Sequence, residues 1–132
     1  MDKIILLYGN DDLMFDRGAL LLQDALCKRF PSYKVKRAHQ PDEVLNYSDD
    51  FLIIVDVAKG ISEPVYFTDP DMLTLRKTVT AHDMDLASFL KMLKAVGTLA
   101  EIPIVALPYD KDPFSFKENV FDLILSAEKE RI

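Results

Sequence analysis

Asp16, Asp56 and His82 combine residue type and position in a way that could support metal chemistry. Two carboxylates and an imidazole can bind a divalent transition metal such as nickel, zinc or iron. An incomplete protein shell of this kind leaves coordination positions open, so the metal can polarise a carbonyl group or activate water. Spacing along the chain is a weak signal for such a site. Whether these three side chains converge therefore depends on the helices and strands that carry them.

Asp56 follows an uninterrupted apolar run, residues 51–55. The run lacks the alternation of a half-exposed strand, so it predicts a central strand of an α/β sheet with both faces covered. Asp56 would then lie at the carboxyl end of this strand, where open α/β sheets bind their ligands. A carboxylate in that place must be solvated, paired or bound to a cation, because an isolated buried charge is too costly.

Asp16 and His82 both lie where a predicted strand connects to a helix. Asp16 falls in the first turn of a helix that Pro31 ends, and a carboxylate is favourable near that positive end of the dipole. Gly18 suggests close backbone packing or a late helix start. The buried face of this helix is predicted to contain Phe15, Ala19, Leu22, Leu26 and Phe30. His82 directly precedes a second helix, which Gly97 ends and whose apolar stripe contains Leu86, Phe89, Leu90 and Leu93.

The remaining segments complete the predicted sheet and its helices. Strands are expected at 3–8, 33–37, 65–68 (at an edge or antiparallel) and 103–107, a short helix at 41–47, and a last helix opened by the capping box of Ser115 and Glu118. This order predicts an α/β fold, a three-layer α/β/α sandwich with a mostly parallel sheet of about five strands and a possible mixed edge. We expect residues 1–132 to form a single domain.

Composition narrows the classes of partner. The net charge is −6 and no basic cluster is present, so nucleic acid and anionic membranes are excluded as expected partners. No apolar stretch is long enough to span a bilayer, and the N-terminus lacks the pattern of a signal peptide. The single cysteine, Cys27, lies in an apolar helical pattern and is predicted to be a buried thiol. One cysteine cannot form an internal disulfide, which favours a reducing cytoplasm.

Several segments together match a known pattern. Residues 4–10 match a first strand that ends in a G-x-G-N turn, Asp16 matches the acid of a following D-[DE] segment, and residues 52–56 match a strand with a terminal Asp. Residues 80–90 resemble an S-x-H-x-x-x-L-x-x-x-L segment, and residues 103–108 resemble the V-G-I-x-P strand ending. Over most of its length the chain resembles the hydrogenase maturation endopeptidases, nickel-dependent proteases that trim the C-terminus of a hydrogenase large subunit.

The resemblance implies a function and a set of site residues. Asp16, Asp56 and His82 would together contact nickel and form the catalytic set of an aspartyl-type, metal-dependent endopeptidase. The nickel would arrive in the active site of the hydrogenase large-subunit precursor, so the protease would bind no metal permanently. The metal would mark the substrate as loaded and position the scissile peptide, with no Ser or Cys nucleophile. We expect a cytoplasmic monomer whose partner is this precursor.

The sequence also departs from the family pattern. Leu7 stands where the first Gly of G-x-G-N is usual, Arg17 adjoins Asp16, and residues 38–40 replace a Gly-Gly-Thr-type loop that lies near the substrate. His39, in that loop, has nothing in the sequence to single it out. An inactive divergent relative that acts as a binding protein is therefore an open alternative. So is an α/β domain whose acids are surface caps.

A signalling module is the other alternative. Asp11 and Asp12 after the first strand, Asp56 after a central strand and the late Lys111 resemble a response-regulator receiver domain. In such a domain the acids would hold Mg²⁺ and Asp56 would accept a phosphoryl group. However, no predicted strand ends in Ser or Thr near residues 82–88, and Lys111 follows directly after the last strand. The pattern therefore favours the protease.

Overall fold

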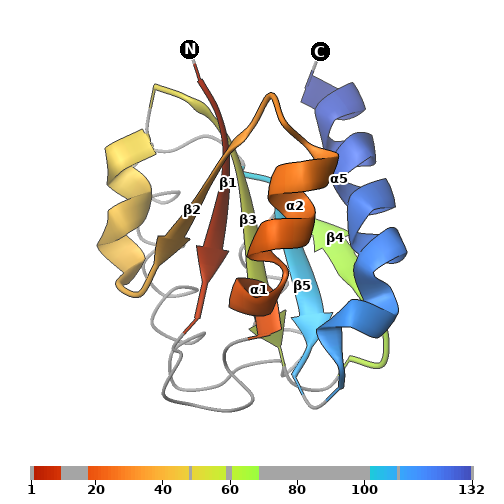
Figure 1. Ribbon diagram of the computed structural model, residues 1–132. Helices are drawn as coiled ribbons and strands as arrows, with labels where there is room; N and C mark the ends of the chain where they lie inside the picture. The colour runs from red at the N-terminus through yellow and green to blue at the C-terminus, as the bar shows by residue number, and fades with distance from the viewer. Residues whose placement is uncertain are drawn as a thin grey trace.

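A computed structural model of the protein describes residues 2–9, 18–47, 49–58, 61–68, 102–109 and 111–131. These residues form a five-stranded sheet in the order β2-β1-β3-β5-β4 (Figure 1). The strands are β1 (Lys3–Tyr8), β2 (Lys34–Ala38), β3 (Phe51–Ala58), β4 (Val65–Phe67) and β5 (Ile104–Pro108). All neighbouring strands are parallel except β4, which runs antiparallel to β5 at the edge. The predicted α/β fold with a mixed edge is confirmed.

Among the described residues, three helices cover one face of the sheet: α1 (Gly18–Leu21), α2 (Gln23–Arg29) and α5 (Lys117–Arg131) (Figure 1). The predicted helix after β1 is interrupted at Leu22, which precedes α2 as its N-cap residue. Its predicted apolar stripe is confirmed where the structure describes it. The core on this face includes Ile5, Leu7, Ile53, Val55, Val57, Ala19, Leu22, Leu26, Phe30, Val120, Phe121 and Ile124.

The prediction that Cys27 is a buried thiol is wrong. Cys27 is exposed and reduced, whereas the preceding Leu26 is fully buried. Successive residues of an α-helix point about 100° apart, because each turn contains about 3.6 residues. The face that α2 turns to the sheet is therefore the Leu26 face, and Cys27 points away from it.

The opposite face of the sheet packs against the 3₁₀-helix η1 (Pro41–Tyr47). Pro41 begins this segment, as predicted, although the segment is 3₁₀ and not α-helical. Val44 is fully buried there, and Tyr47, Ile61 and Val65 pack at the margin. Helical segments thus lie on both faces, as a three-layer sandwich requires. This explains why every residue of β3 is buried and why its sequence lacks alternation.

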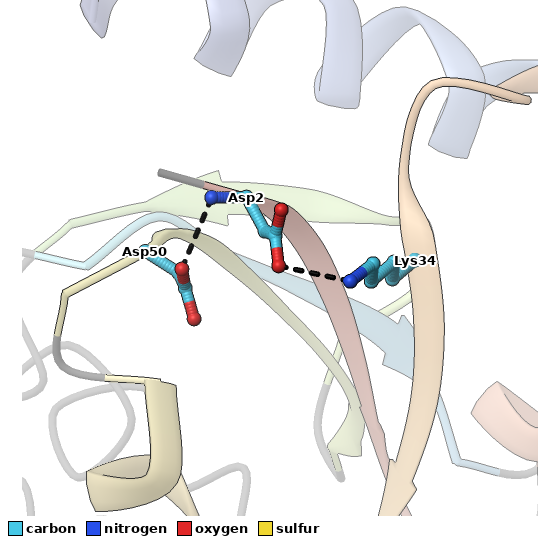
Figure 2. Close-up of polar contacts among 3 residues, drawn as sticks. All are labelled: Asp2, Lys34 and Asp50. Carbon is cyan, nitrogen blue, oxygen red and sulfur yellow. Dashed lines mark hydrogen bonds and ion pairs between the residues drawn. The ribbon is translucent and has the colours of Figure 1, made fainter.

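Polar contacts join the amino ends of three strands. The backbone N–H of Asp2 donates to Oδ1 of Asp50 at 3.1 Å, and Nζ of Lys34 lies 2.9 Å from Oδ2 of Asp2 (Figure 2). The Lys34 ammonium holds the pKa of the Asp2 carboxyl below its usual range. Because both side chains are exposed, we expect this ion pair to add little stability. Its position marks the edge of the sheet that lies opposite the candidate site.

The last helical region begins earlier than Ser115, the predicted cap. Residues Pro113–Phe116 form the 3₁₀-helix η2, which leads directly into α5. Oδ1 of Asp112 accepts a hydrogen bond from the Phe114 N–H at 3.0 Å, so Asp112 is the N-cap. The Ser115 hydroxyl instead donates to the Asp112 carbonyl oxygen at 2.6 Å. The pattern of Ser115 and Glu118 located the helix but not its cap.

Candidate functional site

Asp56 is the predicted site residue that the structure describes, and it is buried, with 3% of its surface exposed. The prediction that it ends the central strand is wrong, because β3 continues through Val57 and Ala58. These two residues pair with Leu107 and Pro108 of β5, so the backbone ladder continues beyond the carboxylate. Asp56 therefore lies two residues before the end of β3, near the carboxyl edge of the sheet but not at the end of the strand.

The Asp56 side chain points to the face covered by η1. Side chains alternate along a strand, and the neighbours two residues away, Ile54 and Ala58, belong to the core on that face. Oδ1 of Asp56 accepts a hydrogen bond from the Val57 N–H at 2.8 Å. A carboxylate inside an apolar layer is costly unless it is paired or hydrogen-bonded. The hydrogen bond from the Val57 N–H therefore offsets part of the cost of burying Asp56.

Tyr8 lies beside Asp56 on the same face. Leu7 pairs with Val55, so the next residues, Tyr8 and Asp56, adjoin on neighbouring parallel strands. Tyr8 is fully buried, and its hydroxyl donates to the Gln40 carbonyl oxygen at 3.2 Å. Burial raises the pKa of the Tyr8 phenol, and the negative charges of Glu43 and Asp56 raise it further. The site therefore contains a neutral phenol next to the Asp56 carboxylate.

The connection between β2 and η1 is fixed to the end of β1. Nδ1 of His39 lies 2.7 Å from the Gly9 carbonyl oxygen, and the Gly9 N–H donates to the Ala38 carbonyl oxygen at 3.3 Å. Oε2 of Glu43 accepts hydrogen bonds from the backbone N–H groups of His39 and Gln40, both at 2.6 Å. The polar groups of this connection are therefore held in place.

Sequence reasoning missed Tyr8, His39 and Glu43 as residues near the candidate site. One signal was present in the chain: Glu43 lies three residues after Gln40, with Pro41 between them at the first helical position. A Glu at that spacing reaches back to the N–H group of the cap residue, which is the second half of a capping box. No local pattern indicates the approach of this loop to β1, because that contact depends on the pairing of β1 with β2.

The start of α1 also lies against the carboxyl edge. A Cβ atom on Gly18 would lie 2.8 Å from Cγ1 of Val57, the residue after Asp56. The predicted close backbone packing at Gly18 is confirmed. Asp16 and His82, the other two predicted site residues, lie outside the described residues. Their convergence with Asp56 stays a prediction.

Two features are absent from the described residues. Within the ranges that the structure describes, no group of three His, Cys, Asp or Glu side chains is arranged to hold a metal ion. In the same ranges, no helix has both the length and the apolarity to cross a membrane. The described part of the site therefore contributes one predicted metal-contacting residue, Asp56.

Comparison with solved structures relates the fold to known proteins. An endopeptidase from Escherichia coli, solved in solution, superposes with a TM-score of 0.70 at 18% identity, over 98% of this chain and 93% of that chain. A hydrogenase 3 maturation protease gives 0.63 at 20% identity, over 92% and 88%. The hydrogenase maturating endopeptidase HybD from E. coli gives 0.63 at 14% identity, over 98% and 93%. The chain has the fold of the hydrogenase maturation proteases. No protein-family model and no curated protein sequence matches it.

The sheet distinguishes this fold from a receiver domain. Receiver domains of the flavodoxin-like class order their parallel strands 2-1-3-4-5. Here the described sheet places β5 next to β3, and β4 is antiparallel at the edge. Nζ of Lys111 lies 3.4 Å from the Ser62 carbonyl oxygen, in the segment before β4. These features do not favour the phospho-acceptor role for Asp56.

Proposed function

We propose that this protein is a peptidase that removes the C-terminal extension of a nickel-loaded hydrogenase large-subunit precursor. The observation that carries the proposal is the similarity of the whole fold to solved hydrogenase maturation proteases. A buried acid near the carboxyl edge of the central strand supports it, because that edge is the usual ligand-binding edge of an open α/β sheet.

In this proposal the nickel is part of the substrate. Asp56, together with Asp16 and His82, contacts the metal that the precursor carries. Carboxylate and imidazole ligands suit nickel, and their number leaves positions for the metal's ligands in the precursor.

The departures from the family pattern have structural counterparts. Leu7, which stands in place of the usual Gly, is fully buried in the core on the helix face. The loop at residues 38–40 is fixed by Gly9 and Glu43. The third departure, Arg17, lies outside the described residues. Neither of the two described departures occupies the position of Asp56, so we propose that they alter which precursor is accepted and leave the reaction unchanged.

The test is a processing assay with candidate large-subunit precursors, followed by the change in gel mobility and by mass spectrometry of the released peptide. Wild-type protein should cleave nickel-loaded precursor and leave nickel-free precursor intact. Asp56→Asn and His82→Ala should each abolish cleavage. Asp122→Asn, the same chemical change at an exposed position of α5, is the matched control and should cleave at the wild-type rate.

Two outcomes would decide against the proposal. Unchanged cleavage by Asp56→Asn would remove Asp56 from the site. Binding of the nickel-loaded precursor without cleavage by the wild-type protein would instead support an inactive relative that acts as a binding protein. Treatment of the free enzyme with a chelator, followed by its removal, should not reduce activity, because the metal enters with the substrate.

A further inference from the structure

We propose that His39 is a substrate-contacting residue of this site, and that Glu43 is the residue that positions it. In this proposal Nε2 of His39 accepts a hydrogen bond from a donor group of the peptide that lies along the carboxyl edge of the sheet. The inference rests on the proposed peptidase function, and it names a contact that belongs to this chain's own loop.

The orientation of the His39 ring follows from its contact with Gly9. Nδ1 lies 2.7 Å from the Gly9 carbonyl oxygen, which can only accept a hydrogen bond. Nδ1 therefore carries the hydrogen, and in the neutral ring the lone pair is on Nε2. Because the side chain is exposed, this acceptor is available at the surface.

The backbone around His39 is also held in place. Oε2 of Glu43 accepts hydrogen bonds from the N–H groups of His39 and Gln40, while the Tyr8 hydroxyl donates to the Gln40 carbonyl oxygen. The loop is thus joined to η1 on one side and to β1 on the other. A ligand-binding side chain whose ring and backbone are both fixed loses little conformational freedom on binding, which favours affinity.

The position of His39 is suitable for a second contact beside Asp56. Ala38 ends β2, and the order β2-β1-β3 separates the strands of His39 and Asp56 by two spacings. Two spacings amount to about 10 Å. An extended peptide spans about 3.3 Å per residue, so one substrate could contact both residues with a few residues between the contacts.

The charges near this loop select the chemistry of the substrate group. Asp42 and Glu43 lie in the first turn of η1, directly after the loop, and the Glu43 carboxylate contacts the loop backbone, so the potential there is negative. A negative potential favours hydrogen-bond donors and cations over carboxylates. We therefore assign to His39 a peptide N–H or a basic side chain of the substrate.

The experiment uses two substitutions that separate the two nitrogens of the ring. His39→Asn places an amide where Nδ1 lay, so it retains a donor for Gly9 and removes the Nε2 acceptor. His39→Gln places an amide where Nε2 lay, so it retains an acceptor for the substrate and loses the contact with Gly9. Both variants are assayed with the nickel-loaded precursor that the wild-type protein cleaves, and their thermal melts are compared.

Loss of one hydrogen bond to the substrate should raise KM of His39→Asn roughly fivefold, with kcat within about twofold of wild type. His39→Gln should show a smaller rise in KM. In a long-range ¹H–¹⁵N spectrum of the free protein at alkaline pH, the His39 ring should carry its hydrogen on Nδ1. An unchanged KM for His39→Asn, or a hydrogen on Nε2, would overturn the proposal.

The two proposals fail differently. If wild-type protein cleaves no precursor, the proposed function fails and this inference fails with it. If wild-type protein cleaves and His39→Asn has wild-type kinetics, the function stands and only the role of His39 is rejected. A fall in thermal stability of His39→Asn with unchanged KM would assign His39 a structural role only.

Discussion

The backbone of Gly18 lies so close to Val57 that a Cβ atom at position 18 would be 2.8 Å from Cγ1 of Val57. Gly18 begins α1, and Val57 follows the buried Asp56 in β3. The absence of a side chain at position 18 therefore allows the helix to begin directly against the carboxyl end of the central strand. This contact packs α1 on the helix-covered face of β3, opposite the face to which the Asp56 side chain points.

Gly18→Ala should destabilise the protein, although Ala is the better helix former. The helix preference favours Ala by about 1 kcal/mol. Val57 is buried and β-branched, so it cannot move aside easily, and overpacking of a core commonly costs about 1–3 kcal/mol. We expect a net loss in the free energy of unfolding, measured by urea denaturation.

Val57→Ala provides the test of the mechanism. In the double variant the methyl group added at position 18 occupies the space that the Val57 side chain vacates. The loss of unfolding free energy in the double variant should therefore be smaller than the sum of the losses in the two single variants. Strict additivity of the two substitutions would contradict a direct contact between these positions.

Asp56→Asn should leave the fold intact. The amide oxygen of Asn can still accept the hydrogen bond that Oδ1 of Asp56 accepts from the Val57 N–H. We expect a change in the free energy of unfolding below about 1 kcal/mol, whereas Asp56→Ala removes this buried hydrogen bond to a carboxylate and should cost about 1–3 kcal/mol. A large loss for Asp56→Asn in thermal melts would show that the charge itself is a structural partner.

Leu26 and Cys27 form a matched pair on α2, one buried and one exposed. Leu26→Ala should cost about 2–5 kcal/mol of unfolding free energy, because it removes buried methyl groups from the core. Cys27→Ala should change stability by no more than about 0.5 kcal/mol. The Cys27 thiol should also react with a thiol reagent in the folded protein at nearly the rate of the denatured chain. Slow labelling under native conditions would contradict the exposed position.

Tyr33 should make the protein sensitive to alkaline pH. Burial and the hydrogen bond from its hydroxyl to Oε2 of Glu128 at 2.7 Å raise the pKa of Tyr33, as does the charge of Glu128. Because the pKa is higher in the folded state, the stabilisation is complete below the ordinary tyrosine pKa of about 10. It is lost as the pH rises above that value, by at most about 1.4 kcal/mol per pH unit.

Tyr33→Phe checks this behaviour. The variant should lose about 1 kcal/mol near neutral pH, where the hydrogen bond is removed, and should show a shallower decline of stability at high pH. Tyr47→Phe is the comparison, because it leaves in place both tyrosines whose pKa is raised, Tyr33 and Tyr8. If stability falls with the same slope at alkaline pH in wild type and in Tyr33→Phe, groups other than Tyr33 cause that fall.

Periodicity in the sequence was sufficient for the sheet, because it reflects local burial. The apolar run at residues 51–55 predicted a strand buried on both faces, and β3 is buried throughout. The spacing of Ala19, Leu22 and Leu26 predicted the face that packs on the sheet, and all three are fully buried. The short, broken sequence at residues 65–68 predicted a strand that is at an edge or antiparallel, and β4 is both.

Only the tertiary structure decided how far β3 extends and what gathers around Asp56. The strand continues past Asp56 because Val57 and Ala58 pair with Leu107 and Pro108, which lie some fifty positions further along the sequence. Likewise, His39 contacts Gly9 because β2 pairs with β1. The sequence by itself determined which segments are buried, since periodicity records local burial, whereas contacts between the ends of different strands depend on strand order, which no local pattern encodes.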